Sequence, residues 1–228
     1  MFIPLKDDTP LRVIRFQFVT VVIIAVNVAV FLLTGPLVGD EAAAIWSTGF
    51  GVVPTELLSG ERNASALLNP VSEPITLLSY MFLHGGWLHL ISNMAFIWVF
   101  ADNIEDAFGV VGFSLFYLLC GVAGALTHVA MSPDSNAPLI GASGAVSGVI
   151  ASYLLLYPHA RVWILLFMRI PLRFQAFWVL GGWALLQIVS LFLIPDEGQA
   201  VAWWAHIGGF MAGLVLTLLL RNRLFHSA

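Results

Sequence analysis

The chain has 228 residues, of which 60% are hydrophobic and 10% charged, and its mean hydropathy of +0.94 lies far above that of soluble globular domains. This composition excludes a soluble enzyme and indicates an integral membrane protein. The formal net charge of −4 says little about partners, because Asp and Glu scarcely affect membrane topology.

A membrane-spanning helix needs about 20 mostly apolar residues. Six segments meet this requirement, the fourth of them short, and they lie near residues 14–34, 81–101, 110–130, 143–157, 174–194 and 201–220. The stretch before the first segment is too polar and too long for a cleavable signal, so we expect that segment to be retained. The sequence therefore predicts an all-α polytopic membrane protein with a bundle of six transmembrane helices, formed by one domain over residues 1–228.

The distribution of Lys and Arg predicts the orientation of the chain, because these residues are enriched in cytoplasmic segments near span ends. Apart from Arg62, all of them fall in or beside residues 1–13, 102–109, 158–173 and 221–228. Both termini are therefore expected on the cytoplasmic side, and a bacterial inner (plasma) membrane is the expected location.

The connections between spans contain two unusual stretches. Residues 35–80 form a long outer loop between the first two spans, and its apolar runs suggest that it leans on the membrane surface. The apolar run 162–168 is too short to cross and is expected to dip into the inner interface. Cys120 is the single cysteine, so an internal disulfide is impossible, and we interpret it as a packing residue.

Polar side chains inside spans are costly and therefore informative. Ser143 lies 14 residues before the inner end of its span and His206 lies 15 residues before Arg221, which places both roughly 21–22 Å above the inner boundary. By the same rise His89 lies at roughly 20 Å and Asn93 one turn deeper on the same face. A serine, a histidine and an amide are thus expected at comparable depth.

These are the residue types that nucleophilic catalysis by a serine requires. A neutral imidazole can accept the serine proton, and an Asn side chain and backbone N–H groups at a helix start can stabilise an oxyanion. The acidic residues lie outside the predicted spans, so the sequence predicts a Ser–His dyad without a carboxylate. Gly141 and Gly144 permit a tight turn and close approach of a substrate.

Small residues also predict which helices pack together. Gly148 continues a small-residue face on the fourth span, and Gly209 and Gly213 form a GxxxG face on the sixth. Each feature has a structural alternative: small-residue faces are generic packing devices, a lone membrane histidine is more often a buried hydrogen-bonding residue, and the HxxxN pair can join helices. Their coincidence at one depth favours catalysis.

Two other classes of function fit these residues less well. A membrane metalloprotease needs ligands such as an HExxH motif, which is absent, so we expect neither metal nor cofactor. A transporter or channel lined by histidines would leave the glycine-flanked serine unexplained; the candidate lining residues are His84, His89, His128 and His206.

Three motifs resemble those of the rhomboid intramembrane serine proteases. They are HGGWLHLISNMAFIWVFADNIEDAFG, GASGAVSG and AHIGGFMAG, and the resemblance covers residues 70–220 in matching order and spacing. The loop 35–80 lacks the Trp-Arg dipeptide that many members carry there.

The resemblance implies a role for individual residues. Ser143 would be the nucleophile and His206 the general base, while Asn93 and the backbone around Ala142–Gly144, with help from His89, would form the oxyanion hole. Glu105 and Gly109 match a structural loop motif, and His84 matches a structural histidine. Members often carry a Tyr beneath the base where this chain has Ser147, so a flat partner for His206 must come from elsewhere.

The implied function is cleavage of single-span membrane proteins near the outer side of the bilayer. The resemblance implies that residues 195–200 cap the site and that substrates enter beside the fifth span. Aromatic residues of that span would form part of the entrance or a lipid-facing belt: Phe177, Trp178 and Trp183. The expected partners are such substrates and the lipid bilayer, with no nucleic acid and no metal. The rival is a non-catalytic rhomboid-like protein that binds membrane helices.

Overall fold

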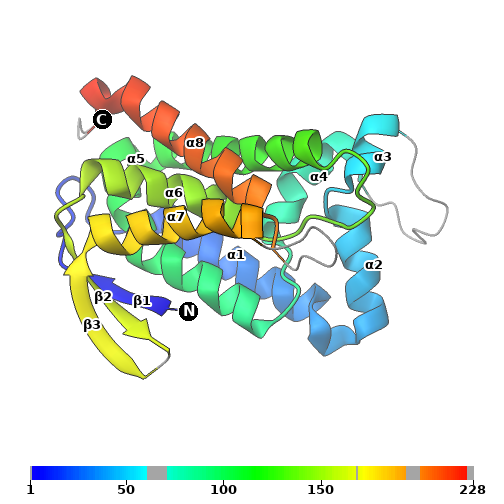
Figure 1. Ribbon diagram of the computed structural model, residues 1–228, viewed down its shortest axis with the longest axis horizontal. Helices are drawn as coiled ribbons and strands as arrows, with labels where there is room; N and C mark the ends of the chain where they lie inside the picture. Colours follow the sequence, from blue (N-terminus) through cyan, green and yellow to red (C-terminus); the bar gives the residue numbers. More distant parts are fainter. Residues whose placement is uncertain (1, 61–70, 168, 194–200, 225–228) are drawn as a thin grey trace.

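The computed structural model describes residues 2–60, 71–167, 169–193 and 201–224. Most of these residues are helical, and Figure 1 shows the long helices lying side by side in a bundle. The helices are α1 (Phe18–Thr34), α2 (Asp40–Phe50), α3 (Pro54–Ser59), α4 (Glu73–Ser79), α5 (Trp87–Met131), α6 (Ser143–Leu156), α7 (Ala176–Leu193) and α8 (Trp203–Leu220). Short 3₁₀ turns lie at Pro36–Val38, Tyr80–Phe82 and Arg221–Arg223.

Four helices of the described chain are long and apolar enough to cross a membrane, and they are α1, α5, α7 and α8. The longest, α5, has 45 residues and breaks at Gly109, whose φ of 72° and ψ of 168° are not helical. Its second half turns back toward the beginning, because Tyr80 Oη, just before α5, donates a hydrogen bond of 2.7 Å to Gly121 O. Figure 1 shows this reversal at the left end of the bundle.

The break in α5 changes one prediction. Residues 87–101 of the predicted span 81–101 and the whole predicted span 110–130 belong to a single broken helix, and residues 102–108, predicted as a loop, are helical. Two acidic residues of this helical stretch are bound by backbone N–H groups, Glu105 by the first turn of α1 and Asp106 by residues 12–14. Glu105 accepts hydrogen bonds from the N–H groups of Val19 and Thr20, at 2.9 and 2.8 Å.

The short helix α6 lies in the centre of the bundle. It has 14 residues, and every residue from Gly144 to Tyr153 is buried. Small residues make this burial possible, since glycine, alanine and serine let neighbouring helices approach closely. The helix is therefore enclosed by protein over most of its length and is shorter than a full span.

The outer connection between α1 and α5 contains helical structure where the sequence predicted a loop. Helix α3 begins with Pro54 in its first turn and ends at Gly60, which has the left-handed conformation that stops a helix. Val52 forms an isolated β-bridge with Leu139, close to the start of α6. This connection therefore packs against the segment that carries Ser143.

A small antiparallel sheet corrects the all-α prediction. It consists of β1 (Phe2–Asp7), β2 (Arg161–Leu166) and β3 (Ile170–Gln175) in the order β1-β2-β3. Alternate residues of β2, Val162 and Ile164, are buried, and this alternation is typical of a strand with one face on a core. Residues 162–166, from the run predicted to dip into the membrane interface, form most of β2, and Phe167 begins the turn that follows.

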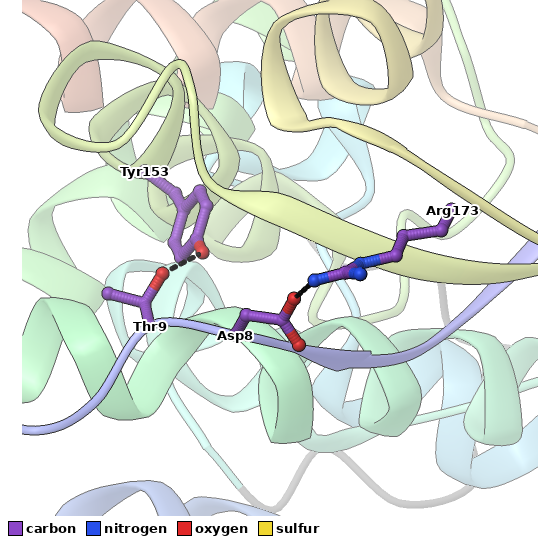
Figure 2. A network of polar contacts seen from close by, with 4 residues as sticks. All are labelled: Asp8, Thr9, Tyr153 and Arg173. Atoms are coloured by element: carbon purple, nitrogen blue, oxygen red, sulfur yellow. Dashed lines mark hydrogen bonds and ion pairs between the residues drawn. The ribbon is translucent and has the colours of Figure 1, made fainter.

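Polar contacts join the sheet and the N-terminal segment to the bundle. Asp8 forms an ion pair with Arg173 of β3, and the Thr9 hydroxyl lies 3.0 Å from Tyr153 Oη of α6 (Figure 2). Asp106 accepts hydrogen bonds from the backbone N–H groups of residues 12–14. Three of the predicted inner segments, 1–13, 102–109 and 158–173, thus meet at one end of the bundle.

Candidate active site

The segment that leads into α6 is held in an unusual backbone conformation. Gly141 has a φ of 119°, which side-chain-bearing residues rarely adopt, and its N–H donates to Tyr80 O at 2.9 Å. A Cβ at Gly141 would lie 2.6 Å from His89 Nε2, so the His89 ring occupies that space. The turn before Ser143 therefore depends on glycine for both its conformation and its close contact with α5.

Ser143 is the first residue of α6, and it meets His206 of α8. The distance from Ser143 Oγ to His206 Nε2 is 2.8 Å, which is a normal hydrogen bond. His206 is 9% exposed and Ser143 is half-buried. The first N–H groups of a helix have no carbonyl partner within the helix, and Ala142 has no side chain that could cap them. A polarised hydroxyl thus lies beside free N–H groups at the positive end of a helix dipole.

A third side chain contacts His206 from its other edge. Gln187 of α7 is 6% exposed, and its Oε1 lies 2.7 Å from His206 Nδ1. Gln187 is not among the site residues predicted from the sequence. The sequence does contain one indication of its importance, because Gln187 is a polar residue in an otherwise apolar span. It lies roughly 17 Å along the helix from Ala176, the start of α7. Propensity and motif patterns do not reveal that it faces the histidine.

Aromatic rings surround His206. The Trp183 ring of α7 lies 6.0 Å away at 34°, and the Trp203 ring lies 6.0 Å away nearly perpendicular. Ser147, where rhomboids often carry Tyr, donates its hydroxyl to Ser143 O at 2.6 Å within its own helix. The packing partners of the imidazole therefore come from α7 and α8.

The other predicted polar residues lie on and beside α5. Asn93 is buried and donates its amide to His89 O at 3.1 Å, one turn earlier in the same helix. The rings of His84 and His89 are 4.9 Å apart and nearly perpendicular. His89 and Asn93 share one face, with His89 against the turn before Ser143.

Glycines bring the backbones of α6 and α8 into direct contact. A Cβ at Gly209 would lie 1.9 Å from Gly144 O, and one at Gly213 would lie 2.4 Å from Gly148 O. Cys120 is buried beside Gly148, as the packing interpretation expects. These contacts place Ser143, which precedes Gly144, within reach of His206, which lies one turn before Gly209.

The aromatic residues predicted for the fifth span differ in their surroundings. Trp178 is 67% exposed and Phe177 is also exposed, whereas Trp183 is directed inward toward His206. The predicted cap, residues 195–200, lies outside the described residues. Within the part of the chain that the structure describes, no three His, Cys, Asp or Glu residues are grouped as metal ligands.

The bundle and its serine–histidine pair define an integral membrane protein with a polar site between helices. Residues 71–223 match the Rhomboid domain, which is about two thirds of the chain, and the chain therefore belongs to the rhomboid family. This finding confirms the resemblance on which the sequence analysis relied.

Curated relatives agree with this membership. The chain is 27% identical over 154 residues to Rhomboid protein 1, mitochondrial, of Saccharomyces cerevisiae, which covers 64% of this chain and 41% of the yeast protein. It is 31% identical over 194 residues to RHOMBOID-like protein 4 of Arabidopsis thaliana, covering 82% of this chain and 41% of that protein. It is 41% identical over 70 residues to Rhomboid-like protein 11, chloroplastic, of the same plant, covering 31% of this chain and 25% of that protein.

The chain thus spans less than half of the length of these relatives. Two of the relatives are named mitochondrial or chloroplastic, so the matches support a membrane location but not the predicted bacterial inner membrane.

Proposed function

We propose that this protein is an intramembrane serine endopeptidase that cleaves single-span membrane proteins with Ser143 and His206 as a catalytic dyad. The observation that carries the proposal is the 2.8 Å contact between Ser143 Oγ and His206 Nε2 inside a bundle of apolar helices. Membership of the rhomboid family, which includes intramembrane serine proteases, adds support.

The proposed chemistry has two halves. In the first, Ser143 Oγ attacks the carbonyl carbon of the scissile peptide bond while His206 Nε2 accepts the hydroxyl proton; the C–N bond then breaks, and the imidazolium returns that proton to the leaving amine. In the second, His206 takes a proton from water, which attacks the acyl-enzyme ester, and the proton passes to Ser143 Oγ as the acid product leaves.

The start of α6 would stabilise the oxyanion that forms in both halves. The backbone N–H groups of Ser143 and Gly144 lack helical carbonyl partners and lie at the positive end of the helix dipole. We assign the same role to the Asn93 amide, with His89 as a neighbour that shapes the turn. Preformed donors of this kind are the largest single source of rate enhancement in many acyl transfers.

In the proposed topology the chain crosses the membrane six times. A straight helix of 45 residues would be about 67 Å long, more than twice the roughly 30 Å of a bilayer core, so the break at Gly109 would divide α5 into two spans. With α1, α6, α7 and α8 this makes six. The basic residues place both termini in the cytoplasm, and Ser143 then lies near the outer side.

Labelling with a fluorophosphonate probe tests the proposal. The purified protein in detergent should be labelled at Ser143, as mapped by peptide mass spectrometry, and should cleave a single-span test substrate. Ser143→Ala should abolish both while the protein still folds, since the change removes one oxygen atom. A wild-type protein that binds the substrate without labelling or cleavage would instead identify a non-catalytic rhomboid-like helix-binding protein.

A further inference from the structure

Gln187 is held in one orientation on the far side of the His206 ring from Ser143. Its Oε1 lies 2.7 Å from His206 Nδ1, while its Nε2 donates to Trp183 O of its own helix at 3.3 Å. An amide group presents one acceptor and one donor side, and the donor side is used by the α7 backbone. The acceptor side is therefore the one directed at the imidazole.

This orientation determines which nitrogen of His206 carries the proton. An amide oxygen can accept a hydrogen bond but cannot donate one, so Nδ1 must be the protonated nitrogen at this contact. The lone pair of a neutral imidazole is then on Nε2, which faces Ser143 Oγ at 2.8 Å. The opposite tautomer would direct the Nδ1 lone pair at the amide oxygen and leave Nε2 without a free lone pair to accept the serine proton.

The use of an amide in place of a carboxylate fits the surroundings. An ionised acid at this depth would be costly to bury, whereas an amide fixes the tautomer without adding a charge. The titratable groups that act electrostatically on His206 are His89 and His128, both on α5. The other side chains in contact with His206 are Ser143 of α6, Gln187 and Trp183 of α7, and Trp203 of its own helix.

The contact between Gln187 and His206 also joins the base to α7, a helix that packs against the bundle through one narrow face. The buried residues of α7 are Ala176, Val179, Leu180, Gln187 and Ser190, and most of the others are exposed or partly exposed. Ser143 and His206 belong to α6 and α8, which are joined backbone to backbone through glycines. Gln187 is thus supplied by a third helix, which packs against the bundle through this one face.

We propose that Gln187 is a positioning residue that holds His206 as the Nδ1-protonated tautomer and directs Nε2 toward Ser143, so that the imidazole can accept the serine proton. This inference rests on the proposed function. It adds to the serine–histidine pair a neutral third member that acts through His206 and does not itself touch the scissile bond.

Two substitutions test the role in turnover. Gln187→Met keeps an unbranched side chain of similar length but removes the acceptor, and we expect kcat to fall about tenfold with KM unchanged, the effect of one neutral hydrogen bond. Gln187→Glu places a carboxylate beside Nδ1–H that stabilises the imidazolium, and we expect the acidic limb of the activity profile to move to higher pH. The matched control is Ser190→Ala on the same buried face of α7, expected to keep the wild-type kcat and profile.

The tautomer is measured without reference to activity. In protein labelled with ¹⁵N-histidine, the resonances of His206, assigned by their loss in His206→Gln, should report a protonated Nδ1 and an unprotonated Nε2 at neutral pH. Gln187→Met should give a mixture of tautomers, and Ser190→Ala should give the wild-type spectrum.

The outcomes separate the two proposals. An Nε2-protonated His206 in the wild type, or Gln187→Met with wild-type kcat and spectrum, overturns the role of Gln187 even when the wild type cleaves its substrate. A wild type that neither labels nor cleaves overturns the proposed function, and the spectrum then still tests whether Gln187 selects the tautomer.

Discussion

Gly209 and Gly144 pack so closely that a Cβ at Gly209 would lie 1.9 Å from Gly144 O. The same contact recurs one turn further, where a Cβ at Gly213 would lie 2.4 Å from Gly148 O. No side chain separates α8 from α6 at these points, so the two helices are joined by backbone atoms. This close packing is the reason that Ser143 and His206 can share a hydrogen bond across two helices.

Gly209→Ala should therefore separate α6 from α8. A methyl group cannot fit against a backbone oxygen, so we expect the free energy of unfolding to fall by about 1–3 kcal/mol, with loss of cleavage. The thermal midpoint in detergent and the cleavage rate measure the two effects. Gly182→Ala on α7 is the matched control, because a Cβ there meets nothing within 4 Å and should be tolerated. Equal stability and activity of both variants would refute the packing argument.

Asn93→Ala should reduce turnover and leave the fold intact. The Asn93 amide donates to His89 O within α5, a bond that does not hold α5 to another helix. If the amide turns to the oxyanion during reaction, kcat should fall about 10²–10³-fold with little change in KM. The test is kcat measured beside the thermal midpoint. A destabilised variant with intact turnover would remove Asn93 from the site and identify it as a structural residue.

Asp7→Asn should gain stability relative to the wild type as the pH rises. Burial raises the pKa of Asp7 above its ordinary value, against smaller opposing hydrogen bonds that include one from Tyr153. A carboxyl with a raised pKa in the folded state binds its proton more tightly there than in the unfolded chain. Its ionisation therefore destabilises the fold increasingly as the pH rises from about 4, the unfolded pKa, through the folded value.

Asparagine at position 7 cannot ionise and escapes this loss. The measurement is the difference in thermal midpoint between variant and wild type in detergent, taken at intervals between about pH 4 and pH 8. This difference should shift in favour of the variant with rising pH. A constant difference, or one that shifts the other way, would show that ionisation of Asp7 carries no such cost.

Chelators should leave proteolysis unchanged. The proposed chemistry uses a hydroxyl and an imidazole, and the described residues contain no group of three potential metal ligands. Cleavage of the test substrate is measured with and without an excess of EDTA. Activity that disappears with EDTA and returns with added zinc would identify a metalloenzyme and contradict the dyad.

The positions of the apolar helices follow from local sequence. The predicted segments 143–157, 174–194 and 201–220 agree within two residues with α6, α7 and α8. This agreement has a physical reason: in lipid each backbone group needs a partner inside its own segment, so a long apolar run is compelled to be helical. The positions of these helices can therefore be predicted from the hydrophobicity of each segment alone.

The sheet and the contacts of His206 depend on pairs of residues that are distant in sequence. Phe2 of β1 is paired with Leu166 of β2, and no local pattern in either segment specifies the other. Gln187 and Ser143 likewise reach His206 from different helices.

Local sequence thus specified which segments are apolar enough to cross a membrane and which residue types could react, because hydrophobicity and reactivity belong to individual side chains. Tertiary packing decided the rest: the sheet register, the α6–α8 contact and the orientation of the imidazole. A hydrogen bond requires two groups within about 3 Å of each other. Only the folded chain brings residues from distant segments that close together.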